Sequence, residues 1–257
     1  MTKLIILLII DWLSGSHNEN KGRVIMKHNK IRVLSGLLLA SAISLCCAST
    51  AMAGGVALGA TRVIFPLNAS QTSLPITNGD KEKVFLIQTW VSTPDEKKTA
   101  DFVVTPPIFV IQPQKENTIR IMYVGKKPLP TDRESLYYLS SKAIPSGKPE
   151  EGQNTLQIAT QTTIKMFVRP GDLPTKSIDA PQTLRCKLDG GTLKVNNPSP
   201  YYVTLVNFTA GGKDLPNTMV APKSEASIPL SGGVGGTIKF KTMNDYGSKT
   251  DEQTCSS

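Results

Sequence analysis

Residues 154–169 (NTLQIATQTTIKMFVR) limit the fold of this chain more than any other segment. They contain neither Gly nor Pro. β-Branched residues crowd their second half and favour a pleated strand over a helix. The alternation covers about fifteen residues, roughly twice an ordinary strand. A strand this long either buries its whole apolar row in its own core or offers part of that row to another molecule. The row consists of Leu156, Ile158, Thr160, Thr162, Ile164, Met166 and Val168.

The first 53 residues read as an upstream extension followed by an export signal. Met26 opens a segment with a basic start, an apolar stretch at 33–47 and a small-x-small motif at 51–53. This pattern is typical of a cleavable secretory signal, with cleavage after Ala53. The apolar stretch is shorter than the ~20 residues that a membrane span needs. We therefore predict Met26 as the true start and a mature chain of residues 54–257.

The positions of the cysteines and histidines limit which catalytic and metal sites the mature chain can form. Two of the four cysteines, Cys186 and Cys255, follow the cleavage site, and an even pair in an exported protein predicts a disulfide. Both histidines, His17 and His28, precede it. Histidine-based catalytic triads and His-ligated zinc are therefore excluded for the mature chain. Six of the 29 basic and two of the 20 acidic residues also precede residue 54, so the mature excess is five positive charges. Without a dense Lys/Arg run, this balance does not indicate nucleic-acid binding.

The rest of the chain reads as short strands separated by turn residues, and no stretch has a helical period. About 204 mature residues fit two domains of about 100. We predict an all-β fold of two immunoglobulin-like β-sandwich domains, 54–169 and 175–257, joined by a Pro-rich linker at 170–174. The other expected strands are 61–66, 73–77, 83–92, 102–105, 108–111, 117–124, 134–141, 193–195, 202–208, 227–230 and 237–243.

Several short motifs, in this order and spacing, resemble the periplasmic chaperones of the chaperone–usher pilus pathway, the PapD-like family. The resemblance covers nearly all of the mature chain. Its short loop at 145–153, and the absence of cysteines near that loop, resemble the short-loop branch. The motifs are TRVIFP at 61–66, NGD at 78–80, QTWV at 88–91, TPP at 105–107, DRESLYY at 132–138, LQIATQTTIKMFVRP at 156–170 and NDYG at 244–247.

The resemblance implies two domains set like a boomerang and a long strand that is donated to an incomplete pilus subunit. In such β-augmentation, main-chain hydrogen bonds supply affinity and alternate side chains fill pockets. The donated strand also covers an apolar groove that would otherwise aggregate. Thr160 departs from the large aliphatic residue that the family usually has there. The implied donor-strand side chains are Leu156, Ile158, Thr160 and Ile164.

The resemblance also implies an anchor for the subunit's C-terminal carboxylate. Its residues are Arg62 and Lys165, with Thr61 as a hydroxyl contact. By pattern alone an arginine at position 62 would point to solvent, whereas the resemblance makes it an anion clamp. Lys165 lies at an odd position of the strand and Leu156 at an even one, so a flat strand would point their side chains to opposite faces. A bulge or strong twist near 162–163 would reconcile the two directions, but the sequence does not show one.

A third set of residues concerns the hinge between the domains. The resemblance implies that Glu134, Arg169 and Asp245 form an interdomain network that sets the angle of the cleft. The alternative is three solvated charges, each contributing ~1 kcal/mol or less.

The function that the resemblance implies is a periplasmic chaperone. It would capture, fold and cap pilus (fimbrial) subunits by donor-strand complementation and deliver them to an outer-membrane usher. It would be no enzyme, would use no cofactor or metal, and would neither bind nucleic acid nor insert into the membrane. Pairing of two copies in a self-capping dimer stays open.

Two other functions compete with this interpretation. The first is a structural pilin or adhesin-type surface protein, against which the polar C-terminus DEQTCSS and the small-residue start GGVALGA speak. The second is an exported hydrolase with paired carboxylates, which needs two facing acids over a cleft. The acids of this sequence are scattered and lack flanking aromatic residues, which argues against a sugar site.

Overall fold

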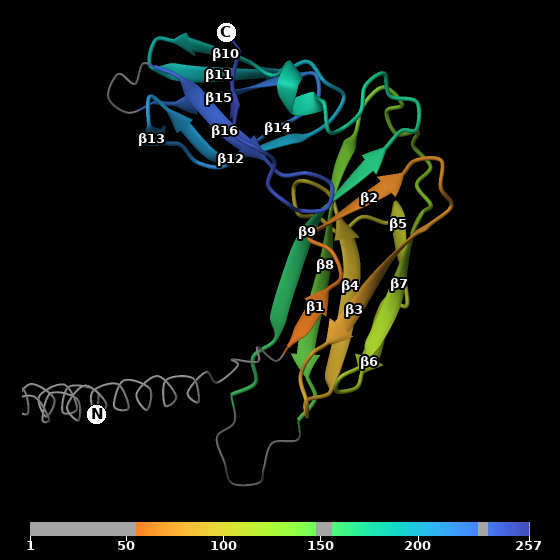
Figure 1. The fold of residues 1–257 in the computed structure, drawn as a ribbon. Helices are drawn as coiled ribbons and strands as arrows, with labels where there is room; N and C mark the ends of the chain where they lie inside the picture. Colours follow the sequence, from red (N-terminus) through yellow and green to blue (C-terminus); the bar gives the residue numbers. More distant parts are fainter. Residues whose placement is uncertain (1–54, 148–155, 231–235, 257) are drawn as a thin grey trace, which may run out of the picture. The chain divides into compact units, whose positions relative to one another are not determined.

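The computed structural model describes residues 55–147, 156–230 and 236–256. The predicted signal segment and most of the loop at 145–153 lie outside the described residues. Within the described part, the chain forms strands and one short 3-10 turn, η1 (Ala180–Thr183) (Figure 1). The prediction of an all-β fold with two sandwiches is confirmed.

The first sandwich packs a four-stranded sheet against a five-stranded sheet. One sheet has the order β1 (Val56–Leu58), β3 (Thr72–Asn78), β7 (Glu116–Tyr123), β5 (Phe102–Thr105). The other has the order β2 (Arg62–Pro66), β9 (Thr160–Arg169), β8 (Ser135–Pro145), β4 (Phe85–Ser92), β6 (Ile108–Ile111). Alternate side chains of both sheets point inward and form one apolar core. Its largest fully buried side chains are Phe65, Ile76, Ile87, Ile119, Ile121, Leu139 and Met166.

The second sandwich is smaller and has its own core. One sheet has the order β10 (Arg185–Asp189), β11 (Thr192–Asn197), β15 (Ser224–Pro229). The other has the order β13 (Lys213–Asp214), β12 (Val203–Ala210), β16 (Ile238–Thr242), β17 (Gln253–Thr254), and β14 (Thr218–Val220) also pairs with β12. Its largest fully buried side chains are Leu184, Leu193, Leu205, Phe208 and Phe240.

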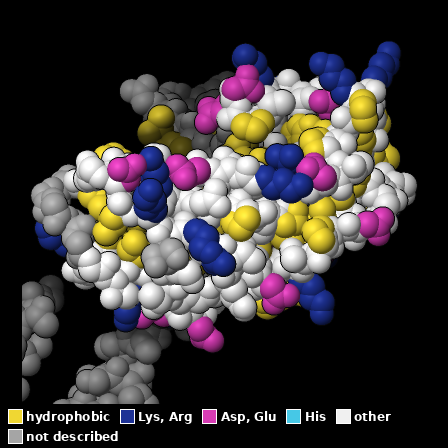
Figure 2. All heavy atoms as spheres, turned by 90° about the horizontal axis from the view of Figure 1, so that it is seen from above, with side chains coloured by type: hydrophobic (Ala, Val, Ile, Leu, Met, Phe, Trp, Pro, Cys, Tyr) yellow, Lys and Arg dark blue, Asp and Glu magenta, His cyan; other side chains and the backbone are white. Residues whose placement is uncertain are grey.

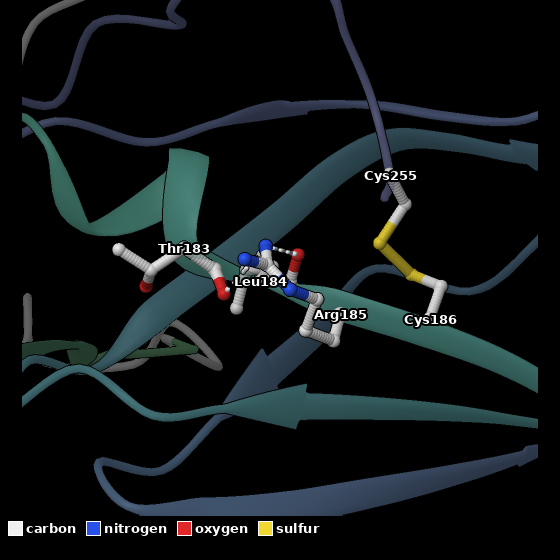
Figure 3. The surroundings of a disulfide bond; sticks show 5 residues. All are labelled: Thr183, Leu184, Arg185, Cys186 and Cys255. Atoms are coloured by element: carbon white, nitrogen blue, oxygen red, sulfur yellow. Dashed lines mark hydrogen bonds between the residues drawn. A yellow bond between two sulfur atoms is a disulfide. The ribbon is translucent and has the colours of Figure 1, made fainter. Parts of the chain in front are cut away.

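The predicted disulfide between Cys186 and Cys255 is present and links the two sheets of the second sandwich (Figure 3). Cys186 lies on β10, and Cys255 directly follows β17. The Cys186 amide also donates to the carbonyl of Ser256 at 2.8 Å. Nearby, the Arg185 guanidinium turns back to the carbonyls of Thr183 and Leu184, at 3.4 and 3.3 Å. The C-terminal segment is therefore fixed across the edge of the sandwich.

The structure corrects several expected elements. No strand was expected before residue 61, but β1 lies there and pairs antiparallel with β3. Strands β10, β13, β14 and β17 were not predicted either, because they are short or mostly polar. The peptide bond between Thr105 and Pro106 is cis, at the corner between β5 and β6.

The long strand is shorter than the alternation predicts. Strand β9 begins at Thr160, whereas the alternating pattern begins at residue 154. The last rung that β9 shares with β8 joins Thr160 to Ala143, and residues 156–159 have no strand partner. An alternating segment forms a regular strand only where a neighbour accepts its main-chain hydrogen bonds.

Candidate functional site

Half of β9 has a free main-chain edge. Parallel pairing joins β2 to β9 from the rung Arg62–Lys165 to the rung Pro66–Arg169. Between Thr160 and Ile164, β9 pairs with β8 alone among the described strands. The N–H and C=O groups on the other edge of this half therefore have no strand partner, which is the arrangement that accepts an added strand.

The apolar row of β9 continues from the core of the first sandwich to its surface. Met166 and Val168 are buried, whereas Ile158 and Leu156 are 67% and 84% exposed. Ile158, Thr160 and Thr162 line a groove of about 380 Å³. The same groove is lined by Val56 and Leu58 of β1 and by Ser141, Ala143 and Pro145 of β8. The open end of the sandwich thus exposes the predicted donor residues Leu156, Ile158 and Thr160.

Ile164 does not belong to the exposed part of this row. It was predicted as a fourth donor residue, but it is buried and packs in the core of the first sandwich. Its side chain is on the same face as that of Met166, because the two are two residues apart on one strand. We therefore correct this prediction and leave Ile164 out of the donated set.

Arg62 and Lys165 lie on the opposite face of the same sheet. Their neighbours Val63 and Ile164 are buried, so the two cationic side chains point away from the core. The ladder between β8 and β9 is unbroken from Thr160 to Val168, so β9 has no bulge near 162–163. The donor row and the cations use opposite faces of one regular strand, and no distortion is needed to place both.

The two cations are partly desolvated and close together. Burial lowers the pKa of Lys165, and the positive charge of Arg62 lowers it further. Burial also lowers the pKa of Arg62, with Asp245 and Glu134 partly opposing it. Neither residue has a salt-bridge partner among the described residues. The Arg62 Nε is buried without a hydrogen-bond partner, and its Nη1 donates to the Met243 carbonyl at 3.4 Å. Such a pair attracts an anion.

Thr61 lies next to a turn of the second domain. Gly247 of this turn has φ +82°, and a Cβ built on it would lie 2.0 Å from Thr61 Oγ1. Only glycine allows the turn to approach this closely without strain. The turn therefore packs directly against the residue that precedes Arg62.

Glu134, Arg169 and Asp245 form the network that the resemblance implied. Arg169 Nε donates to Glu134 Oε1 at 2.7 Å, and its two terminal nitrogens donate to the two Asp245 oxygens at 2.7 and 2.8 Å. Glu134 is 3% exposed, and burial raises its pKa although Arg169 opposes this. The hydrogen bonds from Arg169 lower the pKa of Asp245. The alternative of three solvated charges is therefore excluded.

Family models match both domains of this chain. Residues 55–174 match the pili and flagellar-assembly chaperone, PapD N-terminal domain, and residues 179–254 match the pili assembly chaperone PapD, C-terminal domain. The chain belongs to the PapD-like family of pilus-assembly chaperones.

Individual relatives agree with this assignment. The chaperone is 40% identical to the chaperone protein FimC of Escherichia coli (strain K12) over 239 residues, 92% of this chain and 98% of FimC. The crystal structure of the periplasmic chaperone SfaE is similar, with a TM-score of 0.70 and 39% identity. The match covers 79% of this chain and 100% of the SfaE chain. The structure of the SafB chaperone in complex with the Salmonella enterica SafA pilin is also similar, with a TM-score of 0.72 and 29% identity. The match covers 79% of this chain and 97% of the matched chain. These relatives favour the chaperone over the alternatives of a pilin and a hydrolase.

Some residues around the interdomain network of the chaperone were not predicted. Ser177 donates to Asp245 at 2.9 Å, and the Tyr202 amide donates to Glu134 at 2.8 Å. The Phe167 and Tyr202 rings lie 5.5 Å apart across the same interface. Nothing in the local sequence marks these residues, because their partners are distant along the chain.

In the ranges that the structure describes, no group of three or more metal-binding side chains occurs. No helix in those ranges has the length and apolar character to cross a membrane. On the face in Figure 2, Lys/Arg and Asp/Glu side chains are interspersed.

Proposed function

We propose that the chaperone captures incomplete pilus subunits by adding the free half of β9 to their fold. The unpaired edge of residues 160–164 supplies main-chain hydrogen bonds, and Leu156, Ile158 and Thr160 enter the apolar groove of the subunit. Among the described residues, β9 has an open edge beside an exposed apolar row, and Arg62 and Lys165 on the adjoining rung have no acidic partner. This combination carries the proposal. SafB, the relative solved with a pilin, supports it.

The subunit's C-terminal carboxylate is the anion that completes the charged part of the site. Arg62 offers a planar fork of donors and Lys165 a point charge, while the Thr61 hydroxyl adds a neutral contact. Each charge-assisted hydrogen bond contributes about 1.5–3 kcal/mol. The carboxylate would fix the register in which the subunit's last strand meets β9.

The Glu134–Arg169–Asp245 network holds the two domains in one relative orientation in this proposal. The ion pair between Arg169 and Asp245 joins the first domain to the second, and Glu134 of the first domain accepts a hydrogen bond from the Tyr202 amide of the second. A fixed orientation keeps Arg62 beside the turn that contains Asp245, where the subunit's C-terminus would dock.

The mature chain acts in the periplasm and passes its subunits to an outer-membrane usher. The signal-like segment at 26–53 and the disulfide both fit an oxidising compartment outside the cytoplasm. The relative SfaE is described as a periplasmic chaperone. Without a subunit, the free edge is also available to a second copy of the chain.

Co-purification tests the proposed capture. A pilus subunit from the same cell is produced with the wild-type chaperone, with Arg62→Ala or with Lys165→Ala. We expect both variants to fold and to lose at least ~90% of the recovered subunit, since each charged contact is worth a tenfold change or more. Lys142→Ala, on the same face of neighbouring β8, is the matched control and should retain capture. Undiminished capture by both anchor variants would contradict the proposal.

A further inference from the structure

A second hollow lies next to the proposed anchor and has no assigned occupant. It has a volume of about 320 Å³ and brings Arg62 and Phe167 of the first domain together with residues of the second. The second-domain part includes Ile178, Tyr202 and Tyr246. The pocket therefore combines three cations, Arg62, Arg169 and Lys176, and the carboxylate of Asp245 with several apolar side chains.

Two of these side chains are exposed without contributing to a core. Ile178 is 65% exposed, and Tyr246 is 91% exposed. Neither belongs to the hydrophobic core of the second domain. Exposed large apolar side chains that flank a pocket are typical of a binding surface.

Tyr246 is nevertheless held in place. Its amide donates to Asn244 Oδ1 at 3.1 Å, and the preceding Asp245 is held by Arg169 through two hydrogen bonds. The Ser248 amide donates to the same Asn244 oxygen at 2.9 Å, and Gly247 packs against Thr61. A tyrosine on such a rigid turn loses little main-chain entropy when it binds a ligand.

The occupant follows from the neighbouring anchor. A carboxylate bound at Arg62 belongs to the last residue of a chain, so the side chains next to it must lie within a few ångströms of Arg62. We propose that this pocket takes a bulky apolar or aromatic side chain at the C-terminus of the captured subunit, with Ile178 and Tyr246 as specificity-determining residues. This inference rests on the proposed function and adds a preference among subunits to it.

Synthetic peptides with a free carboxylate test the pocket apart from the rest of the subunit. The probes are SVTVSVF, SVTVSVA and the C-terminal amide of SVTVSVF, each titrated into the mature chain by calorimetry. We expect the Phe-ending acid to bind at least about tenfold tighter than the Ala-ending acid, the effect of burying one large apolar side chain. The double variant Ile178→Ala/Tyr246→Ala should reduce this ratio below about threefold. Leu188→Ala, an exposed apolar residue of β10 outside the pocket, should keep the wild-type ratio.

The outcomes separate the two proposals. Equal affinity for the two acids, with the amide still much weaker, would overturn the pocket and leave the carboxylate anchor intact. Equal affinity for acid and amide, or no binding of any peptide, would overturn the anchor and the pocket with it. If the double variant kept the wild-type preference for the Phe-ending acid over the Ala-ending acid, the assignment of the pocket to Ile178 and Tyr246 would be wrong.

Discussion

Arg62 and Lys165 share one rung of the parallel ladder between β2 and β9. Their side chains therefore lie side by side on the face away from the core, with no acidic partner among the described residues. Two like charges in a partly desolvated site oppose each other and destabilise the unbound chain. We interpret this as a site whose favourable interactions are completed only by a bound anion.

Replacing Lys165 should separate stability from function. The pKa of Lys165 in the folded chain lies below its ordinary 10.5 because of burial and Arg62. At a pH between the folded-state pKa and the unfolded-state pKa, the unfolded chain binds more protons than the folded chain, so the free energy of unfolding rises with pH. Below the folded-state pKa, Lys165 is charged in both states, and the folded chain bears the full cost of burying that charge. We expect Lys165→Met to raise the Tm of the unbound chaperone at pH 7 by up to about 3 °C. Subunit capture should fall at least about tenfold.

Thermal unfolding followed by circular dichroism, together with co-purification, measures both effects. Lys142→Met removes a lysine from the same face of β8 and should leave capture unchanged. A clear decrease in Tm for Lys165→Met would contradict the view of Lys165 as a destabilising charge.

Ile158→Glu should abolish capture without unfolding the chaperone. Ile158 is 67% exposed, so the free energy of unfolding should change by less than about 0.5 kcal/mol. A carboxylate cannot enter an apolar groove without a large desolvation cost. Gln161→Glu adds the same charge on the opposite face of β9 and is the matched control. Urea unfolding and pilin co-purification are the measurements, and normal capture by Ile158→Glu would refute the donated row.

Gly247→Ala should disturb the contact between the second-domain turn and Thr61. The added Cβ would lie 2.0 Å from Thr61 Oγ1, on a residue with φ +82°. We expect a loss of about 2–4 kcal/mol of unfolding free energy from combined strain and overlap. Gly212→Ala has a similar φ of +79° with open space around it, so only the backbone cost of about 1 kcal/mol applies. Equal losses in the two variants, measured by urea unfolding, would show that the contact with Thr61 is unimportant.

Asp245→Asn should weaken the interdomain network in a pH-dependent way. The hydrogen bonds from Arg169 hold the pKa of Asp245 below its ordinary 3.8. The stabilising contribution is therefore complete above pH 3.8 and is lost as the pH falls through the folded-state value. At pH 7 we expect Asp245→Asn to lower the free energy of unfolding by about 1–2 kcal/mol. Solvent screens the partly exposed carboxylate, so the effect is smaller than for a fully buried ion pair.

Urea unfolding at pH 7 and near pH 3 tests this dependence. The difference between wild type and Asp245→Asn should shrink toward acid pH. Asp214→Asn, an exposed aspartate of β13, is the control and should show little difference at either pH. A constant difference between wild type and Asp245→Asn across this range would argue against the charged pair with Arg169.

Local patterns predicted most strands of the first sandwich, because the inward and outward faces of a two-layer fold repeat every two residues. They missed β1 in the first sandwich and β10, β13, β14 and β17 in the second. A three-residue strand such as Val56–Leu58 carries too little pattern, and its existence depends on the distant β3. The candidate residues Arg62, Lys165 and Arg169 came from the resemblance of motifs, since nothing local distinguishes them from solvated charges.

By itself the sequence determined that the chain is all-β, that residues 154–169 carry one apolar row, and that an even pair of cysteines follows the signal-like segment. Only the tertiary structure decided that this row is half core and half surface. It also decided that Ile164 is buried while Ile158 is free, and that Arg62 meets Lys165 from a strand about 100 residues away. The reason is physical: alternation sets the face on which a side chain lies, whereas burial and charge proximity depend on which strand lies alongside and where its pairing stops.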